Sequence, residues 1–146
     1  LRQNILIPFE GGARTGHSIN TGVPHVVYLS GDLATEDVDG VGRRTRYHDL
    51  FKPAGTNVNF IQVLGKHKLS IRTYERGVEG ETLACGTGSV AAALVAGSLR
   101  MVASPVQVTT RSKEKLTITF EGDAEEFGAI YLEGEAKVIC EGTLFV

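Results

Sequence analysis

The sequence predicts an α+β fold in which an antiparallel or mixed sheet wraps around one buried helix. Most of the chain consists of short β-branched or alternating segments, which indicate strands. One segment alone, residues 88–99, is long, alanine-rich and apolar on every side, and a helix without a polar face has to be buried. At 146 residues the chain fits a single domain, residues 1–146, with a core of its own.

Turns rich in glycine or proline separate the predicted strands. The stretch 116–121 shows the strand pattern clearly, because apolar and polar residues alternate as expected for a strand that is wet on one face. Two weaker helical segments, 34–42 and 45–51, lie earlier in the chain. The predicted strands are residues 25–29, 60–64, 68–74, 105–110, 115–120, 129–132 and 136–140.

Composition and charge argue against several function classes. The net charge of −2 gives no reason to expect nucleic acid or an acidic membrane surface as a partner, and the basic cluster 43–46 is interpreted as a solvated loop. No apolar run is long enough to cross a membrane, and no segment resembles a signal peptide. The four histidines lack the mutual spacing of metal ligands, so no metal site is expected at His17, His25, His48 or His67.

The two cysteines, Cys85 and Cys140, lie in different settings. Cys85 belongs to a glycine-rich turn, whereas Cys140 ends the predicted strand 136–140. We therefore expect no disulfide, and a reduced, cytoplasmic protein is favoured. A small thiol buried in a strand explains Cys140 without any chemistry, so Cys140 is not a catalytic candidate.

Cys85 directly precedes the apolar helix and is followed by Gly86, Thr87 and Gly88. A helix start presents unpaired N–H groups and a partial positive charge, so it binds anions and favours a thiolate over a thiol. The glycines let the backbone approach a ligand without interference from Cβ atoms. The segment therefore predicts an active site that acts on an acidic small molecule. A dinucleotide fingerprint over residues 86–91 is rejected, because the strand and the acidic residue that it requires are missing.

Five short motifs occur in one order along the chain. They are Asn-Thr-Gly-Val-Pro-His at 20–25, Thr-Asn-Val-Asn-Phe at 56–60, Glu-Arg-Gly at 75–77, Gly-Glu-Thr at 80–82 and Ala-Cys-Gly-Thr-Gly at 84–88. Together they resemble the diaminopimelate epimerase family, whose members are amino-acid epimerases of lysine biosynthesis that use no pyridoxal phosphate or other cofactor. A family member has two similar halves, each a barrel-like sheet around a central helix, and this chain resembles the C-terminal half.

The resemblance implies catalytic roles for three residues. Cys85 is one of two cysteines that face each other across the substrate α-carbon. One sulfur removes the α-proton as a thiolate, and the other returns a proton to the opposite face as a thiol. His25 and Glu75 influence the protonation of these sulfurs. From the residues alone, a lone histidine at a strand start is usually a structural one.

The resemblance also implies a set of substrate contacts. Glu75 meets the distal ammonium of diaminopimelate, Arg76 holds the distal carboxylate, and the backbone N–H groups of Gly86 and Thr87 receive the α-carboxylate. Asn57 adds an amide contact, although its position after a glycine also fits an ordinary turn residue. The chain departs from the family at Val23, where many members carry a substrate-binding asparagine, and Asn20 is a candidate to compensate.

Three partners follow from the resemblance. They are the substrate diaminopimelate, an N-terminal half that carries the second cysteine, and a second copy of the protein in a homodimer. We expect the chain alone to be inactive, and we expect its last strand, about residues 136–146, to contact or belong to the other half.

Two other functions stay open. One is a cofactor-independent isomerase of the same fold that acts on a proline derivative, which has no distal ammonium and carboxylate for Glu75 and Arg76. The other is a catalytically silent binding domain.

Overall fold

The computed structural model describes residues 1–122 and 126–145, and within them it contains nine strands and two α-helices. One mixed sheet runs in the order β1-β2-β3-β4-β5-β7-β8-β9, with β6 paired to β5. The pairs β3–β4 and β5–β7 are parallel and the others antiparallel. The strands are β1 (Arg2–Phe9), β2 (Gly12–Asn20), β3 (Pro24–Leu29), β4 (Asn57–Gly65), β5 (Lys68–Glu75), β6 (Gly80–Thr82), β7 (Val106–Thr109), β8 (Lys115–Gly122) and β9 (Phe127–Glu133).

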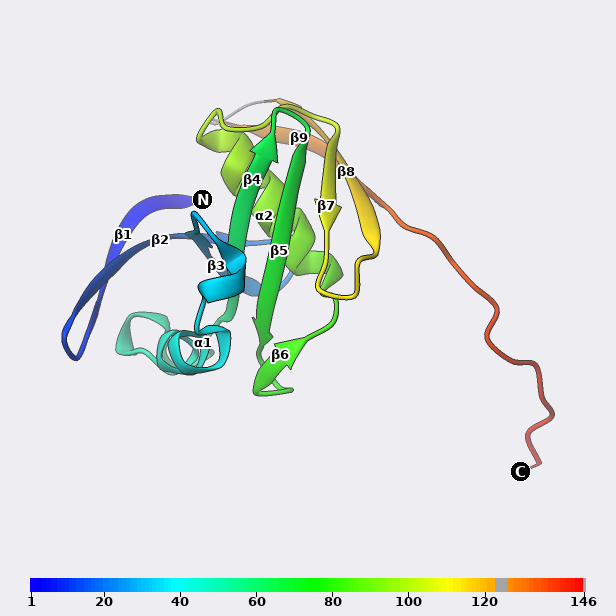
Figure 1. Cartoon of the computed structure of the whole chain (residues 1–146), viewed down its shortest axis with the longest axis horizontal. Helices are drawn as coiled ribbons and strands as arrows, with labels where there is room; N and C mark the ends of the chain where they lie inside the picture. The colour runs from blue at the N-terminus through cyan, green and yellow to red at the C-terminus, as the bar shows by residue number, and fades with distance from the viewer. Residues whose placement is uncertain (123–125, 146) are drawn as a thin grey trace.

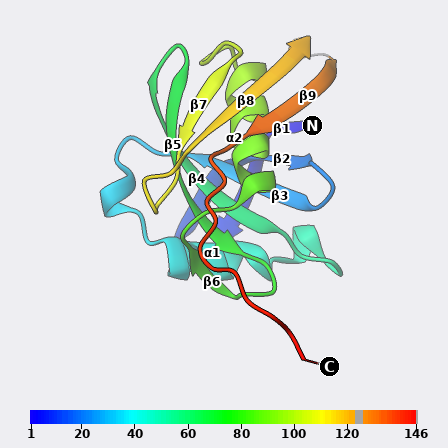
Figure 2. The same ribbon diagram turned by 90° about the vertical axis from the view of Figure 1, so that its right-hand side faces the viewer.

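Helix α2 (Gly86–Ser98) is the central element of the fold. It lies behind β4 and β5 in Figure 1, and it contacts β2, β3, β4, β5, β7 and β8. Figure 2 shows β7 on one side of the helix, β1 and β2 on the other, and β8 crossing the helix. Four alanines between Ala91 and Ala96 are completely buried, and their small side chains let the curved sheet approach the helix on several sides. The predicted sheet around a buried central helix is confirmed.

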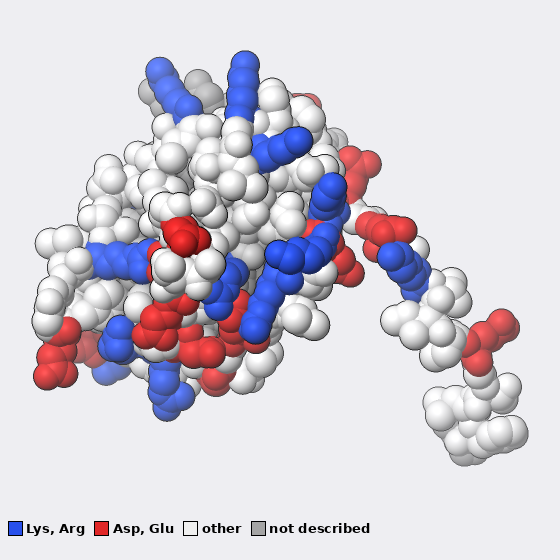
Figure 3. All heavy atoms as spheres, in the orientation of Figure 1, with Lys and Arg blue, Asp and Glu red and all other residues white. Residues whose placement is uncertain are grey.

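Helix α1 (Val38–Arg46) covers the opposite face of β4 and β5. Its first turn is capped by Asp37, whose carboxylate accepts the N–H of Gly40 over 2.9 Å. A second core forms beneath it, where Tyr28 and Phe60 pack against Val38. Because the middle of the sheet is covered on both faces, the first five residues of β4 are all buried. Basic and acidic side chains intermingle on the surface around α1 (Figure 3).

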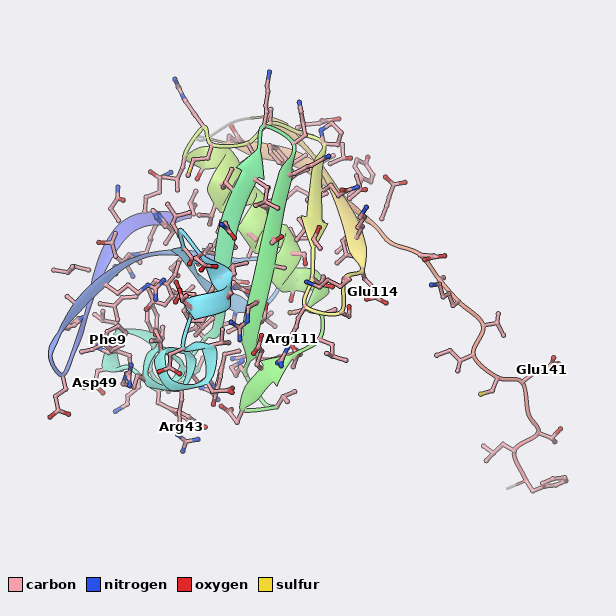
Figure 4. The ribbon with its side chains drawn as sticks, viewed as in Figure 1. Phe9, Arg43, Asp49, Arg111, Glu114 and Glu141 are labelled. Atoms are coloured by element: carbon pink, nitrogen blue, oxygen red, sulfur yellow. The ribbon has the colours of Figure 1, made fainter. Side chains whose placement is uncertain are left out.

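An ion-pair network fixes β6, the strand that leads to Cys85. The Arg72 guanidinium donates to both carboxylate oxygens of Glu81, over 2.7 and 2.8 Å, and Arg111 pairs with the same carboxylate at 2.7 Å. Figure 4 shows Arg111 near β6. The Glu81 side chain is almost fully buried, so its ion pairs are shielded from solvent.

Six of the predicted strands are confirmed, with shifts of a few residues at their ends. The prediction did not include β1, β2 and β6. The predicted bounds of the two weak helical segments, 34–42 and 45–51, were wrong. The structure has α1 in this region, with the short 3-10 turns η1 (Leu33–Thr35) before it and η2 (Asp49–Phe51) after it.

The predicted strand 136–140 is wrong. Residues 134–145 form neither helix nor strand, and Figure 1 shows them leading away from the sheet. Val138 and Ile139 are both 94% exposed, and Cys140 is exposed rather than buried. A strand needs a neighbour for its backbone hydrogen bonds, and this segment has none among the described residues. Val146, the last residue of the predicted segment 136–146, lies outside the described residues.

Within the described ranges, the helices are too short or too polar to cross a membrane.

Candidate active site

Cys85 is the N-terminal cap of α2 and presents its sulfur to the first turn of the helix. The backbone N–H of Gly88 donates to Sγ over 3.4 Å, and Oγ1 of Thr87 lies 3.6 Å from Sγ. The backbone of Cys85 is extended, with φ −141° and ψ 113°. This conformation lets a capping side chain reach the N–H groups of the first helical turn. The predicted helix-start setting of Cys85 is therefore observed, and its catalytic role stays a prediction.

Gly88 allows this turn to pack against β4. A Cβ atom at position 88 would lie 2.5 Å from Oδ1 of Asn59 and 3.1 Å from the sulfur of Cys85. Any side chain here would displace one of these two groups, so the glycine is required by close approach rather than by backbone conformation.

The turn between β2 and β3 meets the helix start. The Thr21 hydroxyl donates to the carbonyl oxygen of Thr87 over 3.1 Å, and this bond joins the 20–25 motif to the 84–88 motif. Asn20 accepts the N–H of Gly22 over 2.9 Å, so its side-chain oxygen belongs to the turn itself. Val23 is half-buried in the same turn.

Neighbouring strands bring four polar residues to one face of the sheet. His25 of β3 is paired with Asn57 of β4, and Asn59, two residues further along β4, is paired with Thr73 of β5. Side chains of paired residues, and of residues two apart in one strand, lie on the same face of a sheet. All four are at most 5% exposed. The sequence analysis named His25 and Asn57 as site residues but missed Asn59 and Thr73.

Asn57 and Arg76 are joined directly. Oδ1 of Asn57 accepts the backbone N–H of Arg76 over 2.8 Å, and Nδ2 of Asn57 donates to the carbonyl oxygen of Pro24 over 3.1 Å. The Arg76 side chain uses Nη1 to donate to the carbonyl oxygen of Ala54 over 3.1 Å. Asn57 therefore ties the end of β5 to the start of β3, and one of its amide hydrogens is left for another acceptor.

His25 is completely buried at the start of β3. Its Nδ1 lies 3.1 Å from Nδ2 of Asn59, and its Nε2 has no hydrogen-bond partner among the described residues. Burial, followed by the positive charge of Arg76, lowers the pKa of His25 to about 4. The imidazole is therefore neutral near pH 7.

Glu75 lies half-buried at the end of β5, beside Arg76 in the chain. Its backbone is paired with Gly80, and no hydrogen bond or ion pair joins its carboxylate to Cys85 or His25 in the described part of the chain. The structure thus brings together the predicted residues at the helix start and those at the ends of β3, β4 and β5, but it shows no contact of the Glu75 side chain with either catalytic candidate.

The fold belongs to the α+β class, with one mixed sheet around a central helix. The chain is similar to crystal structures of PhzF-family phenazine biosynthesis proteins from Enterococcus faecalis (TM-score 0.51, 20% identity, 66% of this chain and 34% of that one) and Bacillus anthracis (TM-score 0.54, 14% identity, 80% and 37%). These similarities establish the fold alone.

The sequence comparisons identify the family. The family model for diaminopimelate epimerase matches residues 17–139, and the chain belongs to this family. It is 49% identical to a diaminopimelate epimerase of Hydrogenobaculum sp. over 98% of this chain and 51% of the relative. It is 46% identical to that of Aquifex aeolicus, over 92% of this chain and 48% of the relative. The chain thus spans about half the length of these curated relatives.

Proposed function

We propose that the complete protein to which this chain contributes interconverts LL- and meso-2,6-diaminopimelate without a cofactor, as an isomerase of lysine biosynthesis in the cytoplasm. The curated relatives are named diaminopimelate epimerases, which supports the substrate. The structural observation that carries the proposal is the sulfur of Cys85 at the N-terminus of a buried helix, within reach of the Gly88 N–H. This chain supplies one of the two cysteines that the reaction needs.

The reaction inverts one carbon centre by two proton transfers. The sulfur of one cysteine, as a thiolate, takes the α-proton, so the C–H bond breaks and its electron pair stays on the α-carbon and spreads into the α-carboxylate. The other cysteine, as a thiol, gives its S–H proton to the opposite face, and a new C–H bond forms there. Two groups are required because one base would return the proton to the face from which it came. Cys85 serves in one direction as base and in the other as acid.

The helix start supplies the hydrogen-bond donors and the positive charge that bind the α-carboxylate. The N–H groups of Gly86 and Thr87 are among the first of α2 and have no partner within the helix. They meet a carboxylate with hydrogen bonds and with the partial positive charge of the helix. The same groups stabilise the additional negative charge that develops as the α-proton leaves.

The distal end of the substrate is held by the end of β5. Arg76 has donors left beyond its bond to Ala54 and binds the distal carboxylate, while Glu75 binds the distal ammonium. The free amide hydrogen of Asn57 adds a contact. This pairing of a cation and an anion favours diaminopimelate over a proline derivative, which has neither distal charge.

We assign His25 and Glu75 to the immediate surroundings of the reacting groups. The lowered pKa keeps His25 uncharged, so it adds a polar group without a second positive charge beside Arg76. Glu75 contributes a negative charge at the end of β5, next to Arg76.

The exposed apolar tail is an argument for a contact with the N-terminal half of the protein. Residues 134–145 carry four apolar side chains, Val138, Ile139, Leu144 and Phe145, that are 85–94% exposed. We propose that this segment packs against the N-terminal half, which also brings the second cysteine to the substrate face opposite Cys85. The homodimer stays a prediction.

Conversion of LL-diaminopimelate by the complete protein tests this function. We expect formation of the meso form in the absence of any added cofactor, and no conversion by the 146-residue chain alone, because one thiol covers one face. Conversion of a proline derivative in place of diaminopimelate would move the protein to the other isomerase class. Inversion by the isolated chain would contradict the two-cysteine scheme.

A further inference from the structure

The side-chain amide of Asn59 uses both of its ends inside the protein. Asn59 is completely buried in β4 between β3 and β5. Its Oδ1 accepts the hydroxyl hydrogen of Thr73 over 3.0 Å. Its Nδ2 lies 3.2 Å from the carbonyl oxygen of Val26 and 3.1 Å from Nδ1 of His25.

These partners fix which way the amide points. The carbonyl oxygen of Val26 can only accept a hydrogen bond, so the group that faces it has to be the NH₂ end of Asn59. The second hydrogen of that NH₂ group is then directed at Nδ1 of His25. Since a donor faces Nδ1, this nitrogen has to present its lone pair. A neutral imidazole carries one proton, which must therefore be on Nε2.

The Nε2–H of His25 is a buried donor without an acceptor among the described residues. Such a group is costly in a protein that has nothing to bind there, because it has lost its water. Asn59 itself packs against the helix start, where its Oδ1 touches the space beside Gly88 and Cys85. The unsatisfied N–H thus belongs to the same cluster as the reactive sulfur.

We infer that Asn59 is a positioning residue that holds His25 in its Nε2–H tautomer, so that His25 donates a hydrogen bond in the candidate site and does not take up a proton there. The role of that donor in epimerisation rests on the proposed function. The tautomer does not, because it follows from the contacts of Val26, Asn59 and Thr73. Burial and the positive charge of Arg76 lower the pKa of His25, which agrees with a ring that stays neutral.

Two consequences distinguish His25 as a neutral hydrogen-bond donor from His25 as a general base. A neutral N–H stabilises an acceptor that gains negative charge, and it does so without moving its own proton. Replacing Asn59 by aspartate reverses the arrangement, because a carboxylate accepts and cannot donate. The proton of His25 then moves to Nδ1 to meet the carboxylate, and Nε2 loses its donor character unless the ring becomes charged.

NMR of the ¹⁵N-labelled chain at neutral pH tests the inference. Two-bond ¹H–¹⁵N correlations distinguish protonated from unprotonated ring nitrogens, and we expect His25 to show a protonated Nε2 and an unprotonated Nδ1. In Asn59→Asp the proton should appear on Nδ1. In the control Asn4→Asp, at an exposed position of β1, the His25 signals should stay as in the unmodified chain.

A proton on Nδ1 in the unmodified chain would overturn the inference, and so would an Asn59→Asp chain that keeps the original tautomer. Should Asn59→Asp fail to fold, the spectrum of the unmodified chain decides alone. Neither result depends on turnover. A complete protein that is inactive on diaminopimelate but shows the Nε2–H tautomer would overturn the proposed function and leave the role of Asn59 in place.

Discussion

The backbone N–H of Arg76 donates to the side-chain oxygen of Asn57 over 2.8 Å. This bond crosses from the end of β5 to the start of β4, and the other end of the same amide holds Pro24, the residue before His25. Asn57 therefore sets the position of two candidate site residues at once. The guanidinium of Arg76 extends from a backbone that is fixed in this way, which is the arrangement expected of a group that has to meet a carboxylate at a defined place.

Changing Arg76→Leu in the complete protein should damage turnover of diaminopimelate. In the proposed site the distal carboxylate then lacks its cation, at a cost of about 1–3 kcal/mol, or roughly a 5- to 160-fold loss in kcat/KM. Steady-state kinetics measure the loss. The matched control is Arg44→Leu on the exposed side of α1, which should leave kcat/KM unchanged. Equal kinetics for the two variants would remove Arg76 from the substrate site.

The change Gly88→Ala should destabilise the chain, whereas Gly86→Ala should not. The added methyl group at position 88 meets Asn59 at 2.5 Å, but at position 86 its nearest contact is Cδ1 of Leu132 at 3.5 Å. We expect a loss of about 1–3 kcal/mol for Gly88→Ala. The exchange at Gly86 should be neutral or stabilising by roughly 0.4–1 kcal/mol, since alanine restricts the unfolded chain. Urea unfolding of the two variants measures both effects, and the same stability for both would contradict the close packing at Gly88.

Much of the sheet could be predicted from the alternation of apolar and polar residues. The strands that lack this alternation could not be predicted in this way. The pattern of β8 places Ile118 in the core and polar neighbours outside, and periodicity finds such a strand. In contrast, β2 carries Gly16 and His17 where apolar residues are expected, and it becomes a strand through its pairing with β1 and β3. Pairing with distant segments is not visible in local composition. For the same reason, the mostly apolar residues 136–140 resembled a strand although they have no partner in the described structure.

The candidate site could be predicted where chemistry and local structure coincide. Cys85 precedes a helix, and that position alone determines its contact with the Gly88 N–H. Asn59 was missed because its contacts come from β3 and β5, which are remote in sequence. Its position two residues after Asn57 was a usable signal, because both side chains then lie on one face of β4.

The buried His25 should make the chain less stable in mild acid. The unfolded histidine binds a proton near pH 6.5, whereas the folded one, with its pKa lowered to about 4, does not. Between these pH values the unfolded state binds more protons, so stability is complete above pH 6.5 and is lost as the pH falls towards 4. The loss amounts to about 3 kcal/mol.

Urea unfolding from pH 7 to pH 4 measures this loss, in the unmodified chain and in His25→Gln. The variant should lose much of the pH dependence, since glutamine does not titrate. The control His67→Gln, at an exposed site, should keep it. The account of His25 is wrong if His25→Gln and the unmodified chain show the same pH dependence.

Trypsin should cleave the isolated chain after Lys137 before it cleaves at any lysine or arginine in the sheet. The Lys137 side chain is 72% exposed within a segment that has no secondary structure, whereas Arg72 lies inside β5. Peptide mass mapping over time orders the cuts. In the complete protein, cleavage after Lys137 should be at least several-fold slower, because the proposed contact with the N-terminal half covers the tail. The same rate in both proteins would contradict that contact.

The most direct test of the central claim is solvent deuterium incorporation by the complete protein and its Cys85→Ala variant. LL-diaminopimelate is incubated in deuterated water, and NMR follows the α-proton signal together with the amount of meso product. The complete protein should form meso product that carries deuterium at the inverted centre, as should the control Cys140→Ala, whose thiol lies in the tail. Cys85→Ala should form no meso product, because one face of the substrate has lost its acid or base. Epimerisation by Cys85→Ala at the rate of the unmodified protein would contradict the account.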